Sequence, residues 1–351
     1  MFNQIMTHSR RILLNIVAGI ASLGAVCAFS SCGMINDDLE ECNQGARLRF
    51  VYDYNLEYAN AFPSQVDCLT LLIYDEDGAY VGSRTASAPV ISDENYRMNI
   101  DLEPGSYHFV AYGGMDCDKS SFHFLEASTG TRSEVRVPDS LRNLEVAMNA
   151  DCITAPVGTN LHKLFYGALD LTVPEGALDY TEGTVKMIRD TNDLRIVLQQ
   201  VNGEEVPDSA FTYRVTADNT LLDYKNDVVP VGDTTFYPWT RGQIRVGENQ
   251  YGSETVVAFA QFSLSRMVVG AQSQLTINEV RDGREVLSIP LIPYMLALRN
   301  QQYEYMEPQE YLDRDNSWEM IFFLDSQWRW VKVEIIVNGW RVKINDIEFG
   351  D

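Results

Sequence analysis

Basic residues, histidines and the usual catalytic motifs are scarce in this chain of 351 residues. It has 27 lysines and arginines against 50 aspartates and glutamates, which gives a formal net charge of −23. A surface this acidic repels phosphate backbones, so we expect no nucleic-acid partner. Apolar residues make up 45% of the chain and aromatic residues 11%, which is too hydrophobic for an acidic disordered protein and enough for packed cores.

Motifs for catalysis, metal binding and phosphate binding are also missing. The four histidines include no helical His-x-x-x-His pair, and neither Gly-x-Ser-x-Gly nor Cys-x-x-Cys occurs. The segment 113–120 resembles a phosphate-binding loop but has Asp118 where glycine is required. Residues 75–78 have turn chemistry without the remaining ligands of a calcium loop. We therefore expect no cofactor, no metal and no catalytic residue.

The N-terminus has the features of a secretory signal peptide. Arg10-Arg11 precedes an apolar run, from Ile12 to about Phe29, that is shorter than the roughly 20 apolar residues of a membrane-spanning helix. The run ends in Phe29-Ser30-Ser31-Cys32-Gly33, which resembles a bacterial lipobox with phenylalanine in place of the usual leucine. We expect residues 1–31 to be removed and Cys32 to carry a membrane-anchoring lipid. The alternative is an ordinary secreted protein in which Cys32 has no lipid.

An acidic segment follows the candidate lipid site. Its acids lie within residues 32–45, which we interpret as a solvated tether, and they are Asp37, Asp38, Glu40 and Glu41. The same acids resemble the surface-export signal of lipoproteins in the Bacteroidetes. That resemblance implies a protein exposed at the cell surface.

Four cysteines are left once Cys27 leaves with the signal peptide and Cys32 takes the lipid. They are Cys42, Cys68, Cys117 and Cys152. An even number of cysteines in an exported chain is typical of disulfide bonds. We expect one or two such bonds, and the sequence leaves the pairing open.

Apolar residues alternate with polar ones through most of the chain, which is typical of strands with one buried face. Up to residue 150 the pattern predicts about seven short strands, among them 48–54, 69–73, 96–102, 107–111 and 144–148. Later strands are predicted at 169–173, 194–198, 211–215, 256–262, 331–337 and 340–344, with Asn338-Gly339 as a hairpin turn. Helix-like stretches are short and lie around Leu296 and Glu310. The predicted fold class is all-β, with two tandem antiparallel β-sandwich domains at 46–153 and 160–351.

Five short sequence motifs follow the candidate lipobox in order. They are Asp37-Asp38-Leu39 with Cys42, residues 48–55 with 59–62, residues 102–114, Tyr311-Leu312-Asp313-Arg314, and Val337-Asn338-Gly339-Trp340. Together they resemble the fimbrial anchor family of the Bacteroidales, the lipoproteins associated with the major and minor fimbrillins. The similarity runs through nearly the whole chain after the signal peptide.

The resemblance implies two transthyretin-like β-sandwich domains and a protein that is not an enzyme. Such an anchor is held in the outer membrane by its N-terminal lipid, holds the base of a fimbria and limits its length. The implied partner is a pilin subunit, and pilins of the same superfamily assemble by adding a strand of one subunit to another. We expect the strand at 48–54 to be retained, because a cut near Arg47 or Arg49 would separate the folded body from its lipid. The C-terminal hairpin, ending in residues 347–351, is the candidate pilin contact.

Two rival functions stay open. A surface lipoprotein of a nutrient-uptake system would bind glycans on exposed, coplanar aromatic side chains, for which the candidates are Trp318, Trp328, Trp330 and Trp340. A secreted hydrolase would need a cleft with two carboxyl groups of perturbed pKa, and the sequence nominates no such pair.

Overall fold

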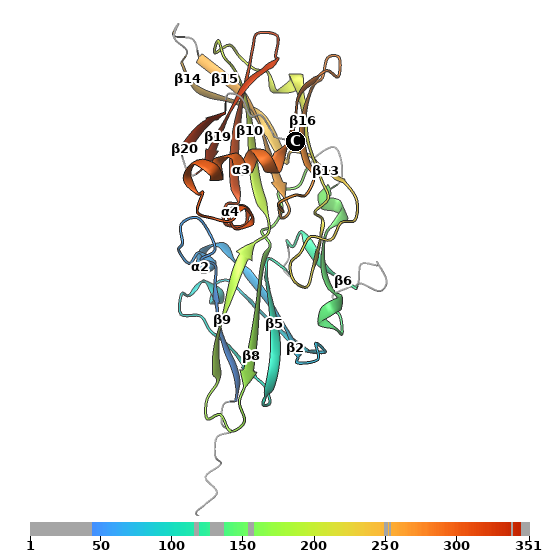
Figure 1. The fold of residues 1–351 in the computed structure, drawn as a ribbon, viewed down its shortest axis with the longest axis vertical. Helices are drawn as coiled ribbons and strands as arrows, with labels where there is room; N and C mark the ends of the chain where they lie inside the picture. Colours follow the sequence, from blue (N-terminus) through green and yellow to red (C-terminus); the bar gives the residue numbers. More distant parts are fainter. Residues whose placement is uncertain are drawn as a thin grey trace, which may run out of the picture. The chain divides into compact units, whose positions relative to one another are not determined.

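The computed structural model describes residues 44–115, 119–126, 137–153, 158–248, 252, 254–337 and 340–344. They belong to one compact unit, residues 44–351. Strands dominate it, and its helices are α2 (Phe62–Gln65), α3 (Leu291–Gln302) and α4 (Pro308–Arg314). The predicted all-β class is confirmed, and the two longer helices lie where the sequence suggested (Figure 1). Within the described part of the chain, no helix has the length and hydropathy needed to cross a membrane.

Seven strands form the largest sheet, in the order β3-β2-β5-β8-β9-β1-β4. Their bounds are β1 Gly45–Val51, β2 Cys68–Asp75, β3 Tyr80–Ser87, β4 Met98–Asp101, β5 Gly105–Gly113, β8 Phe165–Val173 and β9 Thr181–Arg189. A second sheet has six strands, in the order β14-β15-β10-β18-β19-β20. Their bounds are β10 Asn192–Gln200, β14 Thr240–Glu248, β15 Glu254–Leu264, β18 Ser317–Leu324, β19 Trp330–Val337 and β20 Trp340–Ile344.

Two smaller sheets complete the fold. The four-stranded sheet has the order β13-β11-β16-β17, with bounds β11 Phe211–Ala217, β13 Thr234–Phe236, β16 Ser273–Glu279 and β17 Glu285–Pro290. The three-stranded sheet has the order β12-β7-β6, with bounds β6 Phe122–Glu126, β7 Leu144–Met148 and β12 Leu221–Asp223. As predicted, seven strands precede residue 150, and β19 and β20 pair as a hairpin.

Two strand pairs are parallel, whereas the sequence analysis predicted an antiparallel fold. They are β1 with β9 and β10 with β18. Hairpin turns join antiparallel neighbours and leave a local sequence signal, but parallel neighbours need long connections and leave none. The partners in both pairs are far apart in the chain, so alternation alone did not reveal them.

The first strand ends earlier than predicted, at Val51 instead of residue 54. The backbone N–H of Tyr52 donates to the Asn60 side chain, and the Asn55 amide donates to the carbonyls of Tyr52 and Ala59. These side-chain hydrogen bonds replace the strand ladder and turn the chain. Tyr52 is still buried, which explains why its apolar character extended the predicted strand.

Strand β2 is buried on both faces and separates two hydrophobic cores. Leu69, Leu71 and Ile73 pack into one core, and the alternating residues Leu72 and Tyr74 pack into the other. A nearly continuous apolar run is what a strand buried on both faces requires. The two cores therefore meet across the seven-stranded sheet.

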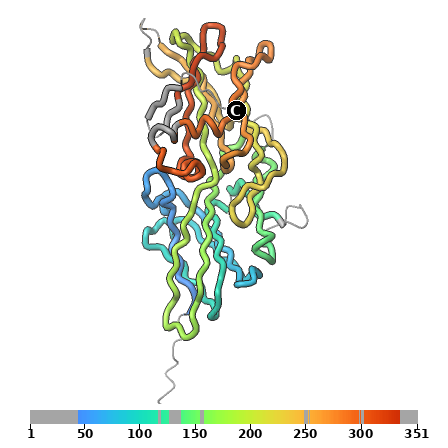
Figure 2. Tube along the Cα trace, viewed as in Figure 1, coloured from blue at the N-terminus to red at the C-terminus, as the bar shows by residue number. Residues whose placement is uncertain are grey.

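The chain passes from the seven-stranded to the six-stranded sheet at Asp190-Thr191. These two residues join the ends of β9 and β10, and both are fully buried; the passage is visible as a continuous run in Figure 2. Strands β8 and β9 follow the predicted linker at 154–159, yet they pair with β5 and β1. The division into domains at 46–153 and 160–351 stays a prediction, while the change of sheet itself lies at Asp190-Thr191.

Candidate functional site

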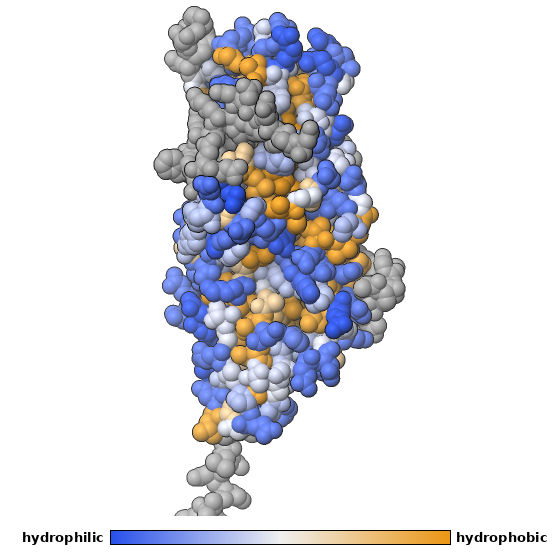
Figure 3. Space-filling view, viewed as in Figure 1, coloured by the Kyte–Doolittle hydropathy of each residue, from blue (hydrophilic) through white to orange (hydrophobic). Residues whose placement is uncertain are grey.

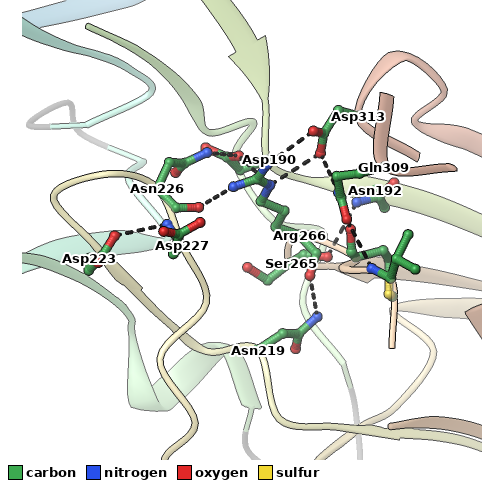
Figure 4. A network of polar contacts seen from close by, with 12 residues as sticks. Asp190, Asn192, Asn219, Asp223, Asn226, Asp227, Ser265, Arg266, Gln309 and Asp313 are labelled. Carbon is green, nitrogen blue, oxygen red and sulfur yellow. Dashed lines mark hydrogen bonds and ion pairs between the residues drawn. The ribbon is translucent and has the colours of Figure 1, made fainter. Parts of the chain in front are cut away.

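A buried network of polar side chains holds the passage between β9 and β10. The Arg266 guanidinium lies between Asp190 and Asp313, with Nη2 3.0 Å from Asp313 Oδ2 and Nε 3.8 Å from Asp190 Oδ1 (Figure 4). The Asn226 amide donates to Asp190 Oδ1 at 2.7 Å, and Gln309 donates to Asp313 Oδ1 at 2.9 Å. The network thus joins the strand passage to α4 and to the loops that carry Asn226 and Arg266.

The carboxyl group of Asp190 has no access to solvent in this network. Burial raises the pKa of Asp190, although the Arg266 charge and the Asn226 hydrogen bond oppose the shift. A buried ion pair of this kind is costly to break, because either partner left alone is an uncompensated charge. The network therefore acts as a structural joint.

A groove of about 880 Å³ lies beside this joint, between α2 and the first residues of β10 and β18. Two ion pairs stand in its walls. Arg189 Nη2 lies 2.7 Å from Asp193 Oδ2, and His162 Nε2 lies 2.8 Å from Asp67 Oδ2. Lys163, Arg195, Glu319 and Trp239 also line the groove.

Gly114 fixes the backbone that carries His162 and Lys163. It follows β5 with a positive φ of 81°, and a Cβ there would lie 1.9 Å from the Lys163 carbonyl oxygen. Only glycine permits this approach. The Gly113-Gly114 pair is therefore a strand-ending turn, as the sequence analysis expected, and it positions one wall of the groove.

Open sheet edges are the second feature of interest, because an unpaired strand offers backbone donors and acceptors to another chain. In the described residues, β14 and β20 each pair on one side only, with β15 and β19. The β14 pairing is interrupted by an irregularity between Arg245 and Gly247, which protects an edge from further pairing. The β19–β20 register is regular. β20 therefore presents the more regular free edge.

β1 lies inside the seven-stranded sheet and not at its edge. It pairs with β9 on one side and β4 on the other. Leu48 is fully buried and Phe50 is 3% exposed. Removing this strand would open the core of the sheet.

The predicted N-terminal sites lie outside the described residues. These are the signal peptide 1–31, Cys32, the acids Asp37, Asp38, Glu40 and Glu41, and the cysteines Cys42 and Cys117. Of the other two disulfide candidates, Cys68 is disulfide-bonded and Cys152 is a free thiol. The pairing stays a prediction.

The candidate aromatic platform does not form among the tryptophans whose side chains are described. Trp318 is 2% exposed and donates to Asn192, and Trp328 packs on Phe211 with 5.2 Å between ring centroids. Trp330 is partly exposed and packs against Phe322. On the face shown in Figure 3, hydrophobic residues gather mostly around the middle, among many hydrophilic ones. These three tryptophans thus pack against the body of the protein and do not form the exposed, coplanar platform that the glycan-uptake alternative requires.

The three histidines beyond the predicted signal peptide do not converge. His108 pairs with Asp170, His123 bonds to Asn149, and His162 pairs with Asp67. No cluster suited to a metal ion is found in the described part of the chain.

Three described carboxyl groups have a raised pKa, namely Asp190, Asp315 and Glu145, and Glu145 lies opposite Asp223 in the β7–β12 pair. Burial raises the pKa of both Asp190 and Asp315, but Asp190 is locked in the Arg266 network. Asp315 lines a smaller groove of about 270 Å³ that does not include Asp190. Neither groove brings two of these three carboxyl groups together. Neither this smaller groove nor the larger one could be predicted from the sequence, because their residues come from segments far apart in the chain.

Comparison with known proteins identifies the family. The model for the fimbrillin-A associated anchor proteins Mfa1 and Mfa2 matches residues 39–346. A Bacteroides thetaiotaomicron protein described as a candidate adhesin is 45% identical, with a TM-score of 0.81, over 88% of this chain and 100% of that one. A second protein of that organism, described as a candidate polysaccharide-binding protein, is 26% identical, with a TM-score of 0.69, over 86% and 99%.

The fimbrial anchor protein Mfa2 from Porphyromonas gingivalis shares the fold. It is 17% identical, with a TM-score of 0.61, over 86% of this chain and 99% of that one. The comparison with curated proteins finds no match. The matched family is structural rather than enzymatic, associates with fimbrial subunits and lies at the cell surface. Because its model matches most of the sequence, this chain belongs to the fimbrillin-A associated anchor family.

Proposed function

We propose that this protein anchors the base of a fimbria in the outer membrane and limits the length of the fimbria. The observation that carries the proposal is the family match, which begins at residue 39, soon after Cys32. In this proposal Cys32 carries the lipid, and Asp37, Asp38, Glu40 and Glu41 direct the protein to the outer face of the membrane. The partner is a pilin subunit.

The interior position of β1 supports the retention of this strand in the mature protein. A pilin that accepts a strand must first lose one, but an anchor must keep its body joined to its lipid. Cleavage near Arg47 or Arg49 would remove part of a strand that pairs on both sides. Sequencing the N-terminus of native protein tests this point, and a start directly after either arginine would overturn it.

We propose the free edge of β20 as the contact for the pilin. An unpaired edge offers a row of backbone donors and acceptors to which an incoming strand can bond. The regular β19–β20 register favours β20 over β14, whose pairing is irregular.

Gene deletion tests the anchoring role. We expect cells without the protein to shed fimbriae into the medium, and the shed fimbriae to be longer than those on wild-type cells. Electron microscopy gives the lengths, and immunoblotting of medium and cells gives the distribution. Cells that keep fimbriae of normal length would contradict the proposal.

Two truncations in the deletion strain test the β20 contact. A chain ending at Ile344 keeps β20, whereas a chain ending at Val337 lacks it. We expect only the first to restore attachment. Thermal unfolding and membrane fractionation must show that both chains are folded and localised. Attachment by a folded chain ending at Val337 would exclude β20 as the contact.

A further inference from the structure

The groove beside α2 contains two cations that lack a carboxylate partner within the described part of the chain. Among the described residues, the hydrogen-bond partner of Lys163 Nζ is the Gln65 side-chain oxygen, at 3.4 Å. Arg195 stacks on the Phe259 ring at 5.4 Å, and its Nε is buried with no hydrogen-bond partner. In a chain with 50 acids against 27 basic residues, two such cations in one groove are an unusual arrangement.

Two carboxylates in the groove pair with other side chains, so Lys163 and Arg195 stay available to a ligand. Asp193 is held by Arg189, and Asp67 is held by His162. Glu319 is the cross-strand partner of Arg195, but no ion pair joins them in the described residues. Burial lowers the pKa of Lys163, and so does the Arg189 charge, whereas the charges of Asp193 and Asp67 oppose the shift.

The other residues that line the groove limit which kinds of ligand can bind there. Amide side chains of Gln65, Asn160 and Gln261 provide donors and acceptors, and Trp239 offers a partly exposed aromatic face. The carboxylates of Asp193 and Glu319 accept hydrogen bonds from hydroxyl groups but repel a doubly charged phosphate. A largely apolar ligand would leave these polar groups unpaired.

We propose that this groove binds a sugar acid, with Lys163 and Arg195 on its carboxylate and the amides and Glu319 on its hydroxyl groups. The volume of about 880 Å³ lies within the usual range for ligand sites. The sugar acid is either free or one unit of a polysaccharide. The site is separate from β20, so this activity does not depend on the anchoring role.

Calorimetry with the full-length, detergent-solubilised protein tests the proposal. The probes are galacturonate, glucuronate, N-acetylneuraminate and trigalacturonate, and the matched neutral probe is the methyl ester of trigalacturonate. We expect at least one acid to bind, and its neutral counterpart to bind about tenfold more weakly or not at all. Tighter binding of trigalacturonate than of galacturonate assigns the site to a polymer, and equal binding assigns it to the free acid.

Variants locate the site. We expect Lys163→Gln and Arg195→Gln each to weaken binding on the order of tenfold. Arg245→Gln, on the exposed edge strand β14, is the matched control and should leave binding unchanged. Thermal unfolding confirms that each variant is folded. If Lys163→Gln is unstable, binding is measured with the conservative variant Lys163→Arg in its place. No binding of any acid, equal binding of the methyl ester, preferential binding of an acidic peptide, or unchanged binding by both folded variants would overturn the proposal.

Discussion

Asp315 is a buried carboxyl group that has no ion-pair partner among the described residues. Its Oδ1 accepts the Ser317 backbone N–H at 3.2 Å, and its Oδ2 is buried without a hydrogen-bond partner. Burial raises the pKa of Asp315 from 3.8 to about 7. The folded protein therefore binds this proton more tightly than the unfolded chain does. The contribution to stability is complete below about pH 4 and is lost as the pH rises to about 7.

Asp315→Asn replaces this group with a neutral side chain of the same shape. We expect the substitution to raise the free energy of unfolding at pH 8 by roughly 2 kcal/mol, because one pKa unit corresponds to about 1.4 kcal/mol. At pH 4 the two proteins should differ by less than about 0.5 kcal/mol, since Asp315 is then protonated. Urea unfolding at both pH values measures the difference.

The exposed acid Glu175 provides the control for this experiment. Glu175→Gln should leave the stability difference between pH 4 and pH 8 unchanged. A loss of stability in Asp315→Asn of the same size at both pH values would show that shape, and not charge, determines the effect.

At the scale of elements, the passage from β9 to β10 joins the two large sheets with only two residues. Such a short passage leaves little freedom to adjust, so the polar groups around it must be satisfied where they stand. Arg266 supplies the positive charge between Asp190 and Asp313, and Asn192, the first residue of β10, donates to the carbonyl of Ser265, which precedes Arg266 in the chain. The joint thus depends on one cation that comes from a distant loop.

Arg266→Gln should destabilise the protein by roughly 3 to 5 kcal/mol, because it leaves two buried carboxyl groups without their charge partner. Arg245→Gln removes an exposed ion pair with Glu254 and should cost less than about 1 kcal/mol. Guanidinium unfolding of both variants at pH 7.5 measures the two losses. Equal losses would mean that the buried network adds no more than a surface ion pair.

Strands with an alternating apolar pattern could be predicted from the sequence, whereas several other strands could not. The central residues of β2, β5, β10 and the C-terminal hairpin were predicted, because apolar residues recur there with a period of two. Strand β14 was missed, since its sequence TRGQIRVGE places apolar side chains in solvent, where no core requires them. The groove was missed as well, because Lys163, Arg195 and Glu319 are brought together only by the crossing of separate strands.

At the scale of the whole molecule, the proposed attachment to the membrane depends on the N-terminus. Without Arg10 and Arg11 of the predicted signal peptide, the chain behind the proposed lipid on Cys32 has 25 basic and 50 acidic side chains, a formal net charge of −25, which favours a body that stays in solvent. Two or more acyl chains bind a membrane nearly irreversibly, whereas the acidic body alone has no affinity for an anionic surface.

Cys32→Ala should therefore release the protein from the outer membrane. We expect loss of palmitate labelling and of the protein from the membrane fraction, measured by labelling and by immunoblotting of fractions. Cys152→Ala, which removes a free thiol in the folded body, is the matched control and should keep both signals. A Cys32→Ala protein that still fractionates with the outer membrane would contradict lipidation at this residue.

The sequence by itself determined the all-β class and the family, because alternation, turn residues and short motifs are local properties of the chain. Only the tertiary structure decided which strands lie side by side, where the chain changes sheets and which charges meet. The parallel pairs β1–β9 and β10–β18, the Arg266 network and the groove at Lys163 and Arg195 all join segments far apart in the chain. Their physical basis is the burial of shared apolar faces, which selects partners by fit in three dimensions and leaves no periodic trace in the sequence.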